Sequence, residues 1–257
     1  MHDAVSRLRE SRLRFAVLSD LHGNLRALEA VLAHVRALGD IEQLVVAGDL
    51  LSGPLEPSKT ADALMAMDAR IIRGNHERQL LECAEAPGGA SDQFAFEHTT
   101  ERQRTWLASL PATIELAPEV LVCHGTPETD LVYLCEAVEG GPLRLASDQT
   151  ITERVGGARH ALIISGHSHL PRTVRLSTGQ LVVNAGSTGL QAYTGEQPRP
   201  HFMENGSPHA RFVVCERTPR GWQVEHHQVL YDSDAASATA AKNGRPDWAL
   251  WLRTGRI

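Results

Sequence analysis

The chain has 257 residues, of which 42% are apolar, and a formal net charge of -6 at pH 7. A chain of this length can bury a core as one domain, and we expect residues 15–257 to form that domain. The acidic balance gives no net attraction to polyanions, so bulk charge does not predict nucleic-acid binding. No apolar run approaches the ~20 residues that a membrane span needs. The oligomeric state is left open.

The cysteines are widely separated and show no CxxC spacing. They are Cys83, Cys123, Cys135 and Cys215. This spacing argues against a zinc ribbon or a redox pair and favours buried thiols in a reducing compartment. Residues 1–14 carry four arginines but no apolar core, so they do not read as a secretory signal. We expect a flexible leader on a cytoplasmic protein.

The first half of the chain alternates predicted strands and helices. Apolar runs at 15–19, 43–47 and 70–73 predict strands, and helical spacing of apolar residues follows at 25–35 and 60–67. Residues 77–113 have a helical pattern that is interrupted by a loop at Pro87-Gly88-Gly89. Such alternation favours an α/β layered fold.

The second half is richer in predicted strands. They fall at 120–123, 161–165, 173–176, 181–184, 210–215 and 222–229. Residues 190–208 are rich in glycine and proline and predict a long loop of functional interest. Residues 232–253 predict a tail of two short helices, and we expect Trp248 and Trp251 to pack against the sheet.

Polar residues follow the ends of five predicted strands. The segments are Asp20-Leu21-His22-Gly23-Asn24, Gly48-Asp49, Gly74-Asn75-His76-Glu77, His124-Gly125 and Gly166-His167-Ser168-His169. The carboxyl ends of strands in an open α/β sheet share one edge, so these side chains are expected to converge there. Oxygen donors and imidazoles without thiolates favour Mn, Fe, Co, Ni or Zn over an all-oxygen magnesium site. The sequence therefore predicts a site for two divalent metal ions.

In this order, and with Val183-Asn184-Ala185-Gly186-Ser187 after them, the segments resemble the calcineurin-like metallophosphoesterase superfamily, especially its small bacterial and archaeal phosphodiesterase branch. The resemblance implies an α/β four-layer sandwich, in which two mixed β-sheets are flanked by helices. It also implies that each metal ion has its own ligand set and that Asp49 bridges the two. The implied sets are Asp20, His22, Asp49 and His169 for one ion, and Asp49, Asn75, His124 and His167 for the other. A hydroxide shared between the ions would attack phosphorus.

The resemblance gives His76 a different role, that of the general acid that protonates the departing alkoxide. It also implies that the side-chain amide of Asn75 could polarise a phosphate oxygen. Protein serine/threonine phosphatases with a similar motif carry an aspartate and an arginine soon after Gly-Asp, whereas this chain has Leu50-Leu51-Ser52-Gly53-Pro54 there. Phosphoprotein substrates are therefore disfavoured, and the motifs contain no partner to orient His76.

The function that the sequence predicts is metal-dependent hydrolysis of small phosphate esters, with a preference for diesters. Further substrate-binding candidates at the mouth of the site are Arg172, Arg199, His201 and His209. Alternatives within the enzyme class are a dinucleoside polyphosphate hydrolase and a phosphomonoesterase. A nuclease is disfavoured because the sequence offers no basic groove or interleaved aromatic residues. An alternative of another class is a noncatalytic metal-binding scaffold, such as the retromer subunit that resembles this fold.

Overall fold

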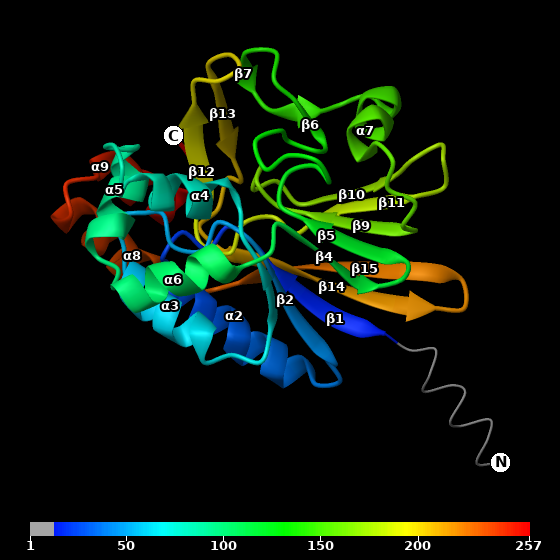
Figure 1. Ribbon diagram of the computed structural model, residues 1–257, viewed down its shortest axis with the longest axis horizontal. Coiled ribbons are helices and arrows are strands. Elements are labelled where there is room, and N and C mark those ends of the chain that lie inside the picture. The colour runs from blue at the N-terminus through cyan, green and yellow to red at the C-terminus, as the bar shows by residue number, and fades with distance from the viewer. Residues whose placement is uncertain (1–12) are drawn as a thin grey trace.

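The computed structural model describes residues 13–257, and its first β-sheet has the order β15-β14-β1-β2-β3 (Figure 1). Strands β1, β2 and β3 are parallel to one another, while β14 runs antiparallel to both β1 and β15. The strands are β1 (Arg14–Leu18), β2 (Gln43–Ala47), β3 (Arg70–Ile72), β14 (Ala210–Thr218) and β15 (Gly221–Val229). The parallel arrangement brings the ends of β1 and β2 to the same edge of the sheet.

The second sheet has the order β10-β11-β9-β5-β4. Strand β9 is parallel to both β5 and β11, and the outer strands β4 and β10 are antiparallel to their neighbours. The strands are β4 (Thr113–Ala117), β5 (Val120–Cys123), β9 (Leu162–Ser165), β10 (Arg172–Arg175) and β11 (Leu181–Asn184). All were predicted except β4.

The two sheets pack face to face through an apolar layer. Alternate residues of β1, such as Phe15 and Val17, point into this layer and are fully buried, as the period of two in a strand requires. They meet Val122 of β5 and Ile164 of β9 from the other sheet. The two sheets therefore form the two inner layers of the fold.

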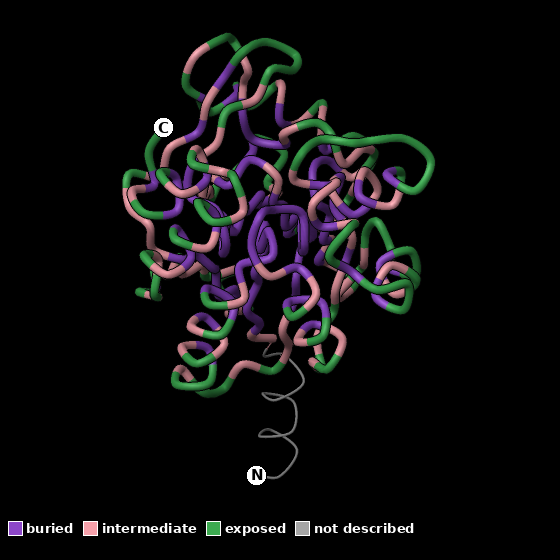
Figure 2. Tube along the Cα trace, turned by 90° about the vertical axis from the view of Figure 1, so that its left-hand side faces the viewer, coloured by how far each residue is buried: buried purple, intermediate pink, exposed green. Residues whose placement is uncertain are grey.

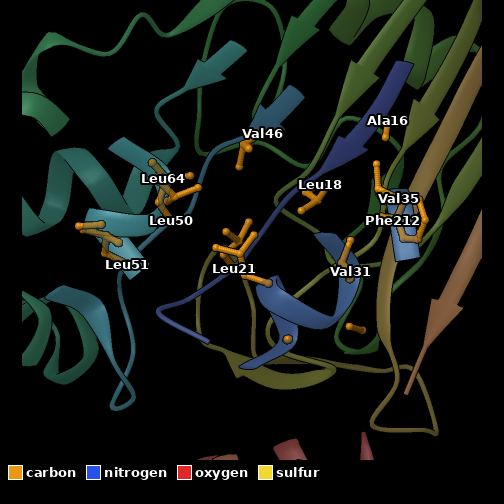
Figure 3. Packing of buried hydrophobic residues seen from close by; sticks show 14 of the residues in the cluster. Ala16, Leu18, Leu21, Val31, Val35, Val46, Leu50, Leu51, Leu64 and Phe212 are labelled. Carbon is orange, nitrogen blue, oxygen red and sulfur yellow. The ribbon is translucent and has the colours of Figure 1, made fainter. Parts of the chain in front are cut away.

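Helices form the outer layers. The outer face of the first sheet is covered by α2 (Leu25–Leu38), α3 (Pro57–Met65), α4 (Asn75–Glu82), α5 (Ala90–Glu97) and α6 (Glu101–Ser109). Figure 3 shows this packing, in which Leu18, Val46 and Phe212 of the sheet meet Val31 of α2. On the other side, α7 (Asp148–Val155) packs against the second sheet through Ile151 and Val155. The four-layer α/β sandwich is confirmed.

The segment 190–208 is not the long loop that its composition predicted. It forms β12 (Ala192–Gly195) and β13 (His201–Glu204), which pair with each other and, through β13, with β7 (Gly141–Pro142). The strands on either side of β7 in the sequence, β6 (Glu136–Ala137) and β8 (Arg144–Leu145), pair with each other in a two-stranded sheet. Strands this short leave little alternation to detect between turn residues, which explains the wrong prediction.

The tail forms two short helices as predicted, α8 (Ser233–Lys242) and α9 (Pro246–Thr254). Trp248 and Trp251 do not pack against either large sheet. They are buried in a separate cluster with Leu55, Leu190 and residues of α8, so that prediction needs correction. Figure 2 shows how the buried segments concentrate in the centre of the molecule.

The predicted leader falls almost entirely on residues 1–12, which lie outside the described part of the chain. Strand β1 begins at Arg14. Among the helices of residues 13–257, none combines the length and apolar character that crossing a membrane requires.

Candidate metal centre

The predicted ligands sit in tight loops at strand ends, and many adopt an uncommon backbone conformation. Five of them have positive φ values: Asp20 (54°), His22 (52°), Asp49 (54°), His167 (69°) and His169 (59°). For residues other than glycine this conformation costs about 1–3 kcal/mol each and concentrates at functional sites. The fold therefore imposes these loop conformations and aims the side chains at one point.

The structure brings the predicted ligands together in two clusters. The first contains Asp20, His22, Asp49 and His169, and the second contains Asp49, His124 and His167. Within each cluster the ligand atoms lie within 4.8 Å of one another. Asn75 joins the second cluster, since its Oδ1 lies 3.1 Å from Nε2 of His124. Asp49 belongs to both clusters.

Backbone carbonyls orient three of the histidines. The Nδ1 atoms of His22, His124 and His169 lie 2.7, 2.8 and 2.9 Å from the carbonyl oxygens of Ser52, Ala47 and Leu190. A carbonyl can only accept a hydrogen bond, so each Nδ1 donates, and each Nε2 faces the centre of the site as the atom that can bind a metal once it carries no proton. This is the arrangement that a metal-binding histidine needs.

Several of the nitrogen and oxygen atoms that would bind metal have no clear proton donor facing them. The Nε2 atoms of His22 and His169 lie 3.1 Å apart. Oδ2 of Asp20 is buried and has no hydrogen-bond partner within residues 13–257. Buried acceptors in this arrangement are unfavourable unless a cation lies among them, so the residues fit a metal centre.

Burial keeps three of the histidines neutral. It lowers the pKa of His22 to about 4 and that of His167 to about 3, and it places the pKa of His169 well below the usual range. Burial also raises the pKa of Asp20 to about 7, with a further contribution from the charge of Asp49. His124 behaves differently, because the Asp49 carboxylate outweighs the effect of burial and raises its pKa to about 10.

Glu77, the last residue of the Gly-Asn-His-Glu segment, holds two ligand loops together. Its fully buried carboxylate accepts hydrogen bonds from the backbone N–H groups of Asp49 at 2.9 Å, Leu50 at 2.7 Å and Gly74 at 2.8 Å. A side chain on Gly74 would clash with the Asp49 carboxylate. The sequence singled out the segment, but it gave Glu77 no role.

The glycine turn after β11 supports the loop that carries His167 and His169. The side-chain amide of Asn184 donates to the carbonyl oxygen of Gly166 at 2.5 Å and to Oγ of Ser168 at 3.1 Å. The hydroxyl of Ser187 donates to the carbonyl oxygen of Asp20 at 2.8 Å. The turn therefore ties the ligand loops of the two large sheets to each other.

His76 has a partner that lies outside the motifs. Its Nδ1 lies 2.8 Å from Oδ1 of Asp92, a buried residue in the first turn of α5. Its backbone N–H donates to Oδ1 of Asp49 at 3.1 Å. Burial lowers the pKa of His76, but Asp49 and the hydrogen bond with Asp92 outweigh it and raise the pKa to about 9. An acid at a helix N-terminus is ordinary, so no sequence signal marks Asp92 for this role.

The four further substrate-binding candidates have different surroundings. Arg172 forms a bidentate ion pair with the buried carboxylate of Glu136, at 2.9 and 3.0 Å. Arg199 is exposed, and His209 is half-buried with an Nδ1 that has no partner in the described chain. His201 lies closest to the chemistry, because it lines a cavity that reaches His76 and His167.

Two cavities open onto the ligand clusters. The smaller one, of about 280 Å³, reaches His22, Asp49 and His169 of the first cluster. The larger one, of about 800 Å³, reaches Asn75 and His167 of the second cluster. His76 lines both cavities. His167 also lines both, so the two cavities meet at the site.

This combination of fold and ligand loops has counterparts among known proteins. The family model of the calcineurin-like phosphoesterase superfamily domain matches residues 13–203. The chain belongs to this superfamily, whose members include metal-dependent phosphoesterases. The match spans every predicted metal ligand and His76.

Individual relatives are distant. The uncharacterized protein MJ0912 of Methanocaldococcus jannaschii is 22% identical over 249 residues, covering 91% of this chain and 94% of that protein. The crystal structure of a metallophosphoesterase from Sphaerobacter thermophilus has a TM-score of 0.71 at 20% identity, covering 95% of this chain and 99% of the other. A candidate diadenosine tetraphosphatase has a TM-score of 0.51 at 20% identity, covering 84% of this chain and 94% of its own. At such identities the structural matches show the fold alone.

Proposed function

We propose that this protein hydrolyses small phosphodiesters with two divalent metal ions, bound one to each ligand cluster. The observation that carries the proposal is the sharing of Asp49 between the clusters. A carboxylate in that position offers one oxygen to each cation and offsets their repulsion. Bound ions would lower the pKa of a water molecule, so that hydroxide forms near neutral pH, and would neutralise charge on the phosphate.

The chain's own groups would orient the ester and supply a proton. Nδ1 of His76 faces Asp92, so the ring can donate from Nε2 to the departing alkoxide. The hydrogen bond to Asp92 fixes the ring orientation that this transfer needs. The amide of Asn75, whose oxygen lies beside His124, would bind a phosphate oxygen through its nitrogen.

The loop after Asp49 supports small substrates over phosphoproteins. In place of the aspartate and arginine of protein phosphatases it has Ser52 and Gly53, and Trp248 of α9 is packed against it. A side chain at Gly53 would come within 2.9 Å of the Trp248 ring. Trp248 is itself 4% exposed and stacks edge-on against His22, with ring centroids 5.8 Å apart.

The alternative functions are a dinucleoside polyphosphate hydrolase, a phosphomonoesterase and a noncatalytic metal-binding scaffold. Retention of the full donor set together with the His76–Asp92 pair favours an enzyme over a scaffold. All four cysteines are buried and unpaired, which supports the expected reducing, cytoplasmic setting.

The test is hydrolysis of bis-p-nitrophenyl phosphate against p-nitrophenyl phosphate. The protein is first stripped with a chelator and then reloaded with Mn, Fe, Co, Ni or Zn in turn. We expect metal-dependent turnover with a preference for the diester. Absence of turnover of both esters with every metal would reject the proposal.

A further inference from the structure

Two tyrosines, which we call the tyrosine wall, stand where the two cavities at the metal centre meet. Tyr133 and Tyr193 line both cavities. The Tyr133 ring lies over His167 with centroids 4.5 Å apart, and the Tyr193 ring lies over His169 at 4.8 Å. The wall therefore contacts a histidine of each ligand cluster at the junction of the two cavities.

Hydrogen bonds hold this wall in one arrangement. Nδ1 of His201 lies 2.8 Å from the carbonyl oxygen of Arg199, so it donates and leaves Nε2 as an acceptor. The hydroxyl of Tyr133 donates to that Nε2 at 3.0 Å and accepts from the hydroxyl of Tyr193 at 2.8 Å. Both phenolic protons are already donated, one to His201 and one to Tyr133, so neither hydroxyl has a proton left to donate to a phosphate.

The two cavities share residues of the β12–β13 hairpin but differ in their other walls. The smaller cavity is walled by Trp248 and Trp251 of α9, and the larger one by the segment around Leu131 and Val138. In Figure 1, α9 and β6, the strand within the latter segment, lie to the left and right of the hairpin. A phosphate at the metal centre can therefore extend one substituent into each cavity.

The arginines that line the two cavities already make contacts within the protein. In the smaller cavity, Arg245 is paired with Asp247, with Nη2 2.7 Å from Oδ2. In the larger one, Nη1 of Arg154 donates to the carbonyl oxygens of Tyr133 and Glu136, each at 2.8 Å. An additional phosphate group would have to break the Arg245–Asp247 ion pair in the smaller cavity, and in the larger cavity it would face the exposed carboxylate of Glu196.

Apolar side chains line both cavities. Leu131 and Val132 line the larger cavity and are 55% and 38% exposed, an unusual exposure that burial against a ligand would remove. Leu190 and the two tryptophans of α9 line the smaller cavity. Both cavities thus offer apolar contact area.

We propose that the substrate is an open-chain phosphodiester with two uncharged organic arms, one in each cavity on either side of the Tyr133–Tyr193 wall. This inference rests on the proposed phosphodiesterase function and narrows it. It excludes dinucleoside polyphosphates, whose arms carry further phosphates. It also explains why a monoester, which has one arm, would leave a cavity empty.

The test measures binding separately from turnover. Phosphinates carry the single charge of a diester but cannot be hydrolysed, and their arms can be trimmed one at a time. Dibenzylphosphinate, benzyl(methyl)phosphinate and dimethylphosphinate are titrated calorimetrically into the metal-loaded protein. Each benzyl arm should tighten binding by about tenfold or more, as expected for burial of a ring.

A variant with one cavity narrowed provides the second part of the test. Val138→Trp places an indole ring in the larger cavity and narrows it, so it should reduce the affinity gain from the second benzyl arm and leave benzyl(methyl)phosphinate within about threefold of wild type. Leu230→Trp is the matched control, because Leu230 is 77% exposed and lines neither cavity. It should bind all three phosphinates as the wild type does.

The outcomes separate the two proposals. Equal affinity for all three phosphinates, a gain from one arm alone, or faster turnover of diadenosine tetraphosphate than of bis-p-nitrophenyl phosphate would overturn the two-arm inference. Arm-dependent phosphinate binding without turnover of any ester would support the two-arm cavities and overturn the proposed hydrolysis.

Discussion

Nδ1 of His76 and Oδ1 of Asp92 lie 2.8 Å apart, although 16 residues separate them in the sequence. The pair joins the first turn of α4 to the first turn of α5. It supplies the orientation that the segment after Asp49 does not provide in this chain. The proposed general acid therefore depends on a helix outside the motifs.

Asp92→Asn should slow turnover without removing metal. The amide keeps the size of the side chain but loses its charge, so the pKa of His76, which Asp92 helps to raise to about 9 against the effect of burial, should fall. A general acid acts only while protonated, so the alkaline limb of the pH–rate profile should move to lower pH. We expect about a tenfold to hundredfold loss for poor leaving groups.

The control for this variant is Glu97→Gln, an exposed acid at the other end of α5. It should leave both the rate and the profile unchanged. An unshifted alkaline limb in Asp92→Asn would show that Asp92 does not act through His76.

His76→Ala should keep its metal and lose rate according to the leaving group. Esters of p-nitrophenol need little protonation, whereas alkyl esters need a proton, so the loss should be larger for the latter by about tenfold or more. Turnover and metal content are measured together, with His98→Ala on an exposed helix end as the control. Equal losses for both ester types would contradict the general-acid role.

Metal binding should release protons. Burial raises the pKa of Asp20 to about 7, and Asp49 raises that of His124 to about 10 despite burial, so both carry protons near neutral pH in the metal-free protein. Ligation requires their loss, and the apparent affinity should therefore rise with pH. Calorimetry in buffers of different ionisation enthalpy measures the released protons. Heats that do not depend on the buffer would contradict this expectation.

Glu77→Gln should destabilise the fold. The buried carboxylate accepts three backbone hydrogen bonds, and an amide group would turn a donor toward at least one of these N–H groups. We expect a loss of about 2–4 kcal/mol in the free energy of unfolding, together with weaker metal binding. Urea denaturation measures the loss, and Glu82→Gln on the exposed side of α4 is the control. Wild-type stability would show that Glu77 does not hold the loops.

The sequence alone predicted those parts of the fold and site that depend on local residue patterns. Apolar runs marked the strands of both large sheets except β4, and the polar residues after them include all seven predicted ligands. The structure gathers these ligands because parallel strands β1 and β2, and β5 and β9, end at common edges.

Long-range contacts account for what the sequence did not reveal. Asp92 and Glu77 act through partners in other segments, and neither differs in type from an ordinary helix-end acid. Tyr133 and Tyr193 meet only because the β12–β13 hairpin folds over the site, and that hairpin was predicted as a loop. Trp248 reaches His22 through the tail, where helical spacing predicted only packing.

The central claim is a centre of two metal ions bridged by Asp49. Elemental analysis of wild-type protein and Asp49→Asn after metal loading, with bis-p-nitrophenyl phosphate turnover on the same samples, tests it most directly. We predict about two ions per chain with turnover in the wild type, and loss of metal and turnover together in the variant. A wild-type chain that holds no metal, or an Asp49→Asn variant with wild-type turnover, would contradict the account.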